Sequence, residues 1–289
     1  MAGYVDIHCH GGGGHGFGDT LESTLAAAAA HREHGTTSVV ASLVSLPLPE
    51  LERQLGVVRE AMDQDSTIIG VHLEGPFLAP SRKGAHDPAA LALPTAELVS
   101  AVLAAGAGIV RQVTIAPELP GAFEAIARLV DAGLVVAVGH TEATADQARA
   151  AFEAGATLVT HAFNAMPPMA GREPGPLGAA LVDERVFIEV IADGIHVDSA
   201  LIAALFKAAP GRVVLVTDAM AAAGGPDGDY QLGGLLVEVS SGRAVLAGTE
   251  TLAGSTLTMD RAVEVCVAAG VPQAQAREAA TVTPLRVLR

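Results

Sequence analysis

The chain has 289 residues, half of them hydrophobic, which is enough to bury one large core and argues against disorder. Its 17 basic and 32 acidic residues give a formal net charge of -15, which argues against nucleic acid or an anionic membrane as a partner. Two cysteines are too few for a disulfide framework, and no apolar run reaches membrane-spanning length, so we expect a cytoplasmic protein.

Short apolar segments rich in β-branched residues alternate with stretches of helical periodicity along the chain. The apolar segments predict strands over 4–10, 36–44, 67–74, 110–116, 134–140, 157–162, 186–193 and 213–218. Stretches rich in Ala, Leu and Glu predict helices over 21–34, 51–62, 96–105, 122–131 and 145–154. Apolar strands alternating with helices are typical of a covered parallel sheet, and eight such strands close into a barrel. The sequence therefore predicts an α/β fold, a (β/α)8 TIM barrel of the metal-dependent hydrolase type, over residues 1–289.

Two parts of the pattern depart from this alternation. The connection at 166–178 is rich in Pro and Gly and predicts a functional loop between the sixth and seventh strands. After the eighth strand, the turn signals Gly233-Gly234 and Ser241-Gly242 predict a small hairpin excursion over about 229–252. A helix over 255–269 is then expected to return to the barrel wall.

Polar side chains occur where five of the predicted strands end. His8 and His10 end the first strand, and alternation along a strand places their rings on one face and Cys9 on the other. The third, fifth, sixth and eighth strands end in Glu74, His140, His161 and Asp218. Because barrel active sites form at the C-terminal ends of the strands, we expect all of these polar side chains at one rim.

This set of side chains predicts a metal centre. Four histidines and two carboxylates can hold one or two divalent ions, and nitrogen and oxygen donors favour zinc, with iron, manganese or cobalt as alternatives. Such an ion lowers the pKa of water to about 7 and polarises a carbonyl group, which is what hydrolysis requires. Asp218, alone on its strand, is the expected proton shuttle.

Short motifs in a fixed order extend over nearly the whole chain. They are VDIHCHGG (5–12), HLEGPF (72–77), KGAH (83–86), IAPE (115–118), GHT (139–141), THAFNAM (160–166), GREPG (171–175), ADGIH (192–196), VTDA (216–219) and GS (254–255). With these motifs the chain resembles the amidohydrolase superfamily and, within it, the N-acetylglucosamine-6-phosphate deacetylases. The resemblance implies metal-dependent deacetylation of N-acetyl-D-glucosamine 6-phosphate to D-glucosamine 6-phosphate and acetate, a step of amino-sugar catabolism and cell-wall recycling.

The resemblance also implies roles for individual residues in the reaction. The metal ligands of the family are matched by Glu74, His140 and His161. A pair that completes a second metal site in some members is matched by His8 and His10. Asp218 matches the catalytic carboxylate that activates water and protonates the departing amine, and His86 matches a residue that polarises the acetyl carbonyl.

Substrate binding is implied by the same resemblance. The expected contacts are His86, Asn164, Ala165, Arg172 and His196. A homodimer is implied in which a neighbouring subunit completes the phosphate pocket. Arg172 is the candidate residue that one subunit contributes to the pocket of the other. A guanidinium fork, an amide and an imidazole are suitable groups for binding a sugar phosphate.

Two other functions stay open. The nearer one is an amidohydrolase acting on a different N-acyl or cyclic amide, such as a dihydroorotase-like enzyme or a deaminase. Several of those relatives bridge two metals with a modified lysine on the fourth strand, but 110–118 contains no lysine, so Glu74 would take that position. The other is a non-catalytic, truncated homologue that binds a sugar phosphate, because the family's accessory β-sandwich is expected to be absent from 1–289.

The remaining histidines and cysteines are expected to be structural. His72 shares a face with Glu74 but lies one layer deeper, which favours core packing. Surface or loop positions are expected for His15, His31 and His34. Cys9 and Cys266 are expected in the core.

Overall fold

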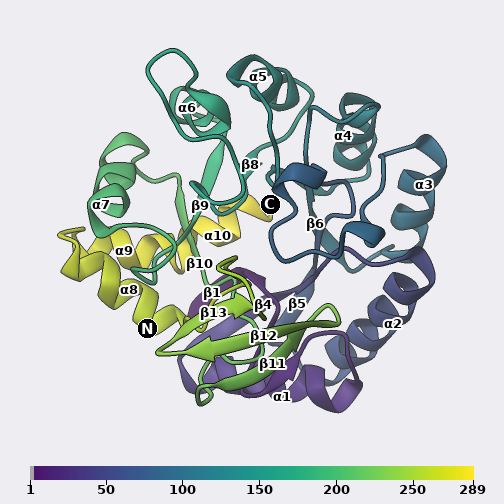
Figure 1. Cartoon of the computed structure of the whole chain (residues 1–289), viewed down its shortest axis with the longest axis vertical. Helices are drawn as coiled ribbons and strands as arrows, with labels where there is room; N and C mark the ends of the chain where they lie inside the picture. Colours follow the sequence, from purple (N-terminus) through teal and green to yellow (C-terminus); the bar gives the residue numbers. More distant parts are fainter. Residues whose placement is uncertain (1–2) are drawn as a thin grey trace.

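A computed structural model describes residues 3–289, in which an eight-stranded parallel sheet curls into a barrel (Figure 1). In chain order, which is also their order in the sheet, the strands are β1 (Tyr4–Cys9), β4 (Thr36–Leu43), β5 (Ile68–Glu74), β6 (Val110–Ile115), β7 (Val135–Val138), β8 (Leu158–Val159), β9 (Phe187–Ile191) and β10 (Val213–Val216). Cys9 and Ala219 form a parallel bridge that joins the end of the sheet to its beginning. The predicted (β/α)8 barrel is confirmed.

Helices surround the sheet in chain order (Figure 1). Their bounds are α1 (Leu21–Glu33), α2 (Leu48–Gln64), α3 (Ala96–Ala105), α4 (Ala122–Asp131), α5 (Ala145–Glu153), α6 (Gly175–Val182), α7 (Ser199–Ala208), α8 (Met259–Ala268), α9 (Gln273–Ala279) and α10 (Val282–Val287). Local sequence fixes several starts, as at α5, where Thr144 and Gln147 form a reciprocal capping box. Helices α1 to α5 confirm the five predicted ones. Among the described residues, none of the helices has the length and hydropathy needed to cross a bilayer.

The core is continuous between the sheet and the helices. Val39 and Val40 of β4 are fully buried, as are Ala27 and Ala28 of α1, and all four belong to one hydrophobic cluster. Polar side chains are buried inside the barrel instead, where His72 of β5 contacts the hydroxyl of Thr114 of β6 at 2.8 Å. The barrel wall is therefore apolar toward the helices and partly polar toward its axis, and this polar interior lies beneath the site.

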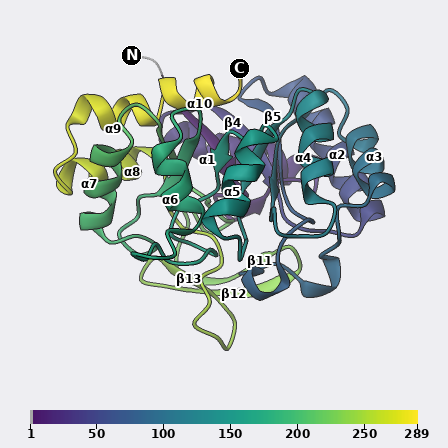
Figure 2. The same ribbon diagram turned by 90° about the horizontal axis from the view of Figure 1, so that it is seen from above.

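The excursion after β10 is a three-stranded antiparallel sheet, one strand more than the expected hairpin. Its strands are β11 (Gly228–Leu232), β12 (Leu235–Ser240) and β13 (Arg243–Leu246). Gly233 and Gly234 form the first turn with φ angles of 56° and 82°, a conformation that favours glycine. Figure 2 shows this sheet at one end of the barrel, opposite α9 and α10.

Three expected boundaries were wrong. Helix α6 begins at Gly175, so only the first part of the Pro/Gly-rich segment 166–178 is a loop. The sixth strand is confined to Leu158–Val159. Helix α8 begins at Met259 rather than at 255, because Ser255 is extended and forms a parallel bridge with Ala219.

Shorter elements complete the described chain. A two-stranded sheet, β2 (Gly11–Gly12) and β3 (His15–Gly16), follows β1 directly. Two short 3-10 helices, η1 (Pro80–Arg82) and η2 (Pro88–Ala90), lie in the connection after β5. Both segments extend the strand ends at which the expected ligands occur.

Candidate metal centre and active site

Three of the expected ligands lie in turns just beyond their strands. His140, His161 and Asp218 follow β7, β8 and β10 and have φ angles of 47°, 25° and 48°. This left-handed backbone is uncommon for residues that carry a β-carbon, and it clusters at functional sites where the surrounding structure enforces it. The same unusual conformation at three strand ends indicates that the rim is built to direct these side chains.

The six expected ligands form two groups that share one carboxylate. A first group contains His8, His10, Glu74 and Asp218, and a second contains Glu74, His140 and His161. Glu74 Oε1 lies 3.4 Å from His8 Nε2 and 3.1 Å from the Nε2 atoms of both His140 and His161. Its Oε2 lies 3.1 Å from His10 Nε2. Glu74 therefore joins the two groups.

Distances between ring nitrogens fit two ion sites. His8 Nε2 and His10 Nε2 lie 3.3 Å apart, and His140 Nε2 and His161 Nε2 lie 3.0 Å apart. Two nitrogen ligands of a tetrahedral zinc ion, each at about 2.0–2.1 Å from the metal, lie about 3.3 Å from one another. The first group can thus hold one divalent ion and the second group another, with Glu74 shared between them.

The charges of the cluster also favour a cation. Burial opposes a charged ring on His8, yet Glu74, Asp218 and Glu189 raise its pKa well above the ordinary value. Burial likewise opposes a charge on His10, but hydrogen bonds with Asp218 and Glu74 raise its pKa to about 9. The carboxylates therefore draw positive charge into the cluster, which a divalent ion supplies.

The pKa values of the two carboxylates in the cluster are lowered. Burial opposes the ionised form of Glu74, but His8 and His140 hold its pKa well below the usual range. Burial also opposes ionisation of Asp218, and His8 and a hydrogen bond from His10 more than offset this, so its pKa is lowered. Both groups are thus kept in the form that coordinates metals and accepts protons.

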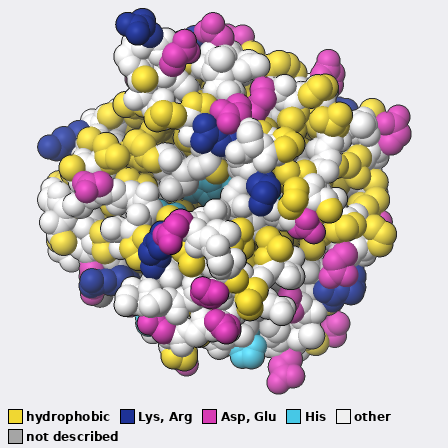
Figure 3. All heavy atoms as spheres, in the orientation of Figure 1, with side chains coloured by type: hydrophobic (Ala, Val, Ile, Leu, Met, Phe, Trp, Pro, Cys, Tyr) yellow, Lys and Arg dark blue, Asp and Glu magenta, His cyan; other side chains and the backbone are white. Residues whose placement is uncertain are grey.

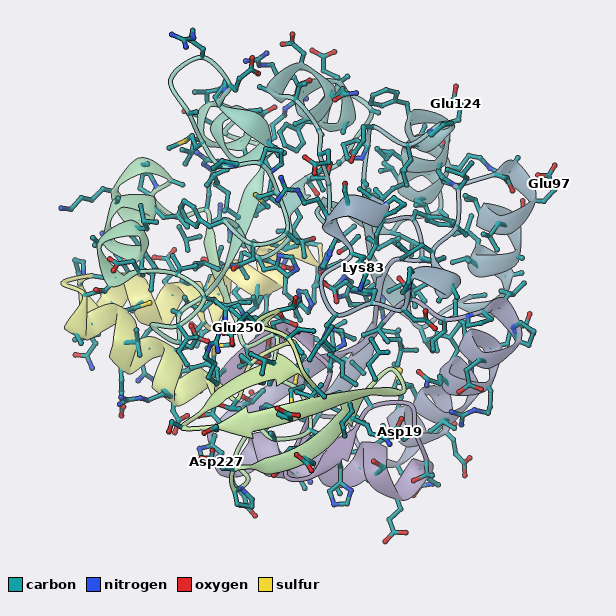
Figure 4. All side chains as sticks on the ribbon, viewed as in Figure 1. Asp19, Lys83, Glu97, Glu124, Asp227 and Glu250 are labelled. Carbon is teal, nitrogen blue, oxygen red and sulfur yellow. The ribbon has the colours of Figure 1, made fainter. Side chains whose placement is uncertain are left out.

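A cavity of about 580 Å³ opens above the cluster, within the size range of small-molecule sites. Its floor is lined by His10, Glu74, His86, His140, His161 and Asp218, and segments 80–85 and 250–252 also line it. Figure 3 shows histidine side chains within a hollow near the middle of this face. In Figure 4, Lys83 and Glu250 lie near that same middle region, whereas Glu97 and Glu124 project from the outer helices.

Four of the five expected substrate contacts line this cavity. They are His86, Asn164, Ala165 and His196. Arg172 differs, because it is exposed on the loop between β8 and α6 and is not among the lining residues. Within the described part of one subunit, the structure therefore does not bring Arg172 to the other contacts.

His86 has a defined orientation. Its Nδ1 accepts a hydrogen bond from the backbone N–H of Ser45 at 3.1 Å, so the neutral ring carries its proton on Nε2. Nε2 lies 3.2 Å from Glu74 Oε2 and faces the cluster. Burial lowers the pKa of His86 to about 4 despite its contact with Glu74, so the ring is a neutral donor at pH 7.

Sequence reasoning missed two residues of the site. Glu189 of β9 is fully buried and contacts His8, although the segment 186–193 is predicted only as a strand, with no site residue in its interior. Lys83 lines the cavity, and its only available signal was its place in the KGAH motif. A charged residue within an apolar strand was the signal that could have identified Glu189.

Among the residues expected to be structural, one expectation was wrong. His31 is buried, not on the surface or in a loop, because α1 turns this residue toward β1, where its ring contacts Cys9 Sγ at 3.2 Å. His72 is confirmed as a core residue with partners on both ring nitrogens, Ser42 and Thr114. Exposed or partly exposed positions are confirmed for His15 and His34, and buried positions for Cys9 and Cys266.

Comparison with known proteins gives relatives over almost the whole chain. An N-acetylgalactosamine-6-phosphate deacetylase of Escherichia coli O157:H7 is 39% identical over 99% of this chain and 77% of its own length. An N-acetylglucosamine-6-phosphate deacetylase of Bos taurus is 38% identical over 99% of this chain and 73% of its own.

A solved structure is more similar still. A mutant N-acetyl-D-glucosamine-6-phosphate deacetylase of Mycobacterium smegmatis, in complex with N-acetyl-D-glucosamine-6-phosphate, is 47% identical with a TM-score of 0.96. It matches 100% of this chain, which covers 77% of that one. In addition, a model of the amidohydrolase family matches residues 1–289. The chain therefore belongs to the amidohydrolase family.

Proposed function

We propose that this protein hydrolyses the acetamide of N-acetyl-D-glucosamine 6-phosphate, releasing D-glucosamine 6-phosphate and acetate. The observation that carries the proposal is the position of Asp218 on the floor of a cavity, as a member of one of two ligand groups that share Glu74. The similarity to deacetylases of N-acetylated amino-sugar phosphates selects the substrate. Other amidohydrolase substrates are not favoured by these relatives, and neither is a non-catalytic role.

One or two divalent ions complete the proposed site. His8, His10 and Asp218 with Glu74 would hold one, and His140, His161 and Glu74 the other. The donor set is nitrogen and oxygen only, which favours zinc over softer metals and is also compatible with iron, manganese or cobalt. When bound, such an ion polarises the acetyl carbonyl and lowers the pKa of the attacking water.

Asp218 is the proposed proton shuttle. Its lowered pKa keeps the carboxylate free to accept a proton from water, and Oδ1 lies 3.3 Å from His10 Nε2 at the centre of the first ligand group. The same atom can then deliver that proton to the departing amine nitrogen, as general acid–base catalysis requires.

His86 is the proposed donor to the acetyl carbonyl. The backbone of Ser45 fixes its proton on Nε2, which faces the cavity floor beside Glu74. A neutral N–H aimed at the oxygen where negative charge develops stabilises the transition state without needing to lose a proton itself.

Recognition of the sugar phosphate is assigned to the mouth of the cavity. Lys83 and Arg82 line it, and His196 and Asn164 line it from the other side of the barrel. Arg82 is paired with Glu142, whereas Lys83 Nζ contacts only backbone oxygens of Gly84 and His86 among the described residues. We therefore assign Lys83 as the main cation for the 6-phosphate in the same subunit.

The experiment is acetate release from the purified protein with added Zn²⁺. We expect turnover of N-acetyl-D-glucosamine 6-phosphate and much less of the unphosphorylated sugar. N-acetyl-D-galactosamine 6-phosphate belongs in the same panel, because one relative carries the name of that epimer. Full activity after removal of metal would contradict the proposal, as would faster release from a cyclic amide than from either amino-sugar phosphate.

A homodimer in the cytoplasm is also proposed, in which Arg172 acts in the neighbouring subunit. Support comes from its exposure on the loop outside its own cavity, and the buried unpaired Cys9 and Cys266 suit a reducing compartment. The test mixes two inactive variants, Arg172→Ala and Asp218→Asn. If Arg172 acts across the interface, a mixed dimer has one intact site, and reassociation at equal amounts restores about a quarter of wild-type activity. No recovery after subunit exchange would show that Arg172 does not act in this way.

A further inference from the structure

A fully buried carboxylate lies directly beneath the ligand groups. Glu189 Oε2 accepts hydrogen bonds from His8 Nδ1 at 3.0 Å and from the backbone N–H of His161 at 3.2 Å. Its Oε1 accepts from Gln112 Nε2 at 2.9 Å. Burying a carboxylate costs several kcal/mol unless its partners compensate, so a position inside the barrel needs a reason. Its partners supply one, because Glu189 touches a member of each ligand group.

The contact fixes which nitrogen of His8 can bind an ion. Because Glu189 Oε2 also accepts from the backbone amide of His161, the proton between Oε2 and His8 belongs to Nδ1 of the histidine. When His8 coordinates a metal, it therefore keeps the proton on Nδ1 and offers Nε2. That atom faces Glu74 Oε1 and Asp218 Oδ1, both at 3.4 Å.

The two ligand groups are supported differently. His140 Nδ1 donates to the backbone carbonyl of Arg82 at 2.7 Å, a neutral acceptor. His161 Nδ1 is buried and has no hydrogen-bond partner among the described residues. Within the described residues 3–289, only the first group, through His8, has a carboxylate behind a ligating ring, an arrangement that fixes the ring and increases its strength as a ligand.

We propose that Glu189 is a positioning residue that determines the affinity of the first ion site, formed by His8, His10, Glu74 and Asp218. It acts through His8 and does not reach the substrate cavity, which it does not line. This inference rests on the metal centre proposed above but not on the identity of the substrate. It separates the two ions, since the second site, formed by Glu74, His140 and His161, has only a backbone contact to Glu189.

Gln112 allows Glu189 to be replaced by glutamine without loss of a hydrogen bond. Its Oε1 is buried and has no hydrogen-bond partner among the described residues. In Glu189→Gln, the remaining oxygen can keep the contacts to His8 and His161, while the new amide nitrogen donates to Gln112 after that side chain flips. The variant thus removes the negative charge while keeping the shape and the number of hydrogen bonds.

The experiment titrates metal-stripped protein with Zn²⁺ against a chromophoric chelator and counts bound zinc per chain by elemental analysis. We expect wild type to bind two ions and Glu189→Gln to bind one of them roughly 10–100-fold more weakly, with the other unchanged. Thr114→Val is the matched control, because Thr114 is buried in the same interior and bonds His72 and Thr160, so it reaches His8 only through the edge-on packing of the His72 ring. It should leave both affinities within about twofold.

A second measurement reads the wild-type protein, so it does not depend on the folding of Glu189→Gln, and His8→Asn serves only to assign the signal. Nitrogen-15 shifts of the zinc-loaded protein should show His8 as the Nδ1-protonated neutral ring, assigned by its loss in His8→Asn. Two unchanged zinc affinities in a folded Glu189→Gln protein would overturn the inference, and so would a His8 ring protonated on Nε2. Absence of acetate release by the wild type would count against the proposed reaction instead. The zinc affinities would still test the role of Glu189.

Discussion

The backbone amide of Asp218 donates to the carbonyl oxygen of His8 at 2.8 Å, so one of the hydrogen bonds that close the barrel also joins two members of the first ligand group. Strand closure and site assembly are therefore the same event at this point. The side chain of Asp218 takes no part in that hydrogen bond. It can be changed while the closure is kept.

Asp218→Asn should abolish most turnover with little loss of structure. The amide has nearly the shape of the carboxylate but cannot accept and return a proton, and losses of roughly 10²–10⁴-fold in kcat are usual for such groups. Acetate release under saturating substrate measures this. The ion held by Glu74, His140 and His161 should remain in elemental analysis. Asp227→Asn, at an exposed turn of the small sheet, serves as the control. Near-normal kcat in the Asp218 variant would remove it from the proposed role.

His86→Ala should lower kcat by roughly 10²–10³-fold, because one donor to the developing oxyanion is lost. His86→Gln should lose less. The amide nitrogen of glutamine reaches the position of Nε2 and retains an N–H donor. Steady-state kinetics of the two variants give the comparison. Equal losses would show that the ring serves packing rather than donation, since both variants remove the imidazole.

The substrate KM should rise with pH above neutrality. Burial alone would lower the pKa of His196, but its 2.6 Å hydrogen bond with Asp193 and the charge of that carboxylate raise it above the ordinary value of 6.5. The charged ring favours an anionic ligand, so affinity is full below about pH 6.5 and is lost as pH rises through the raised value. The expected loss is roughly 10–100-fold, from a charge-assisted hydrogen bond of roughly 1.5–3 kcal/mol. The substrate phosphate is itself a dianion above about pH 7, so KM is measured from there upward.

Asp193→Asn is the control for this pH profile. Oδ1 of Asp193 accepts the backbone N–H groups of Ile195 and His196, and an asparagine oxygen can keep both bonds. The substitution removes the charge, and its amide nitrogen replaces the oxygen that accepts from His196 Nδ1, so both causes of the raised pKa of His196 are lost. The rise in KM should therefore move to lower pH. A profile that does not move would assign the effect to another group.

Much of this site followed from the sequence because it occurs where apolar runs end. The strand ends at Glu74, His140 and Asp218 are visible as changes from apolar to polar residues, and barrel topology brings them to one rim. Glu189 gave a weaker signal, because a single charge inside an apolar strand does not show whether it faces a helix or the barrel axis. His31 directly follows a run of five alanines in α1, so periodicity did not indicate its buried face. Arg172 remained unplaced for a different reason, since its expected partner surface is on another chain.

Close packing around Gly139 sets the position of the adjacent ligand His140. A β-carbon at Gly139 would lie 2.6 Å from Thr160 Cβ and 3.0 Å from Thr114 Cγ2, and neither β-branched side chain can yield easily inside the barrel. Gly139→Ala should therefore destabilise the fold by about 1–3 kcal/mol and displace the adjacent ligand His140.

Gly56 offers a matched control for that substitution. It lies within α2 with no atom near the added methyl group, so Gly56→Ala should stabilise the protein by roughly 0.5–1 kcal/mol. Urea unfolding of metal-free protein measures both changes, and zinc titration reports the site. The two alanines should move the unfolding midpoint in opposite directions, and only Gly139→Ala should weaken the ion held by Glu74, His140 and His161. Equal shifts in the same direction would mean that the barrel interior relaxes around the methyl group, and that packing at Gly139 does not set the position of His140.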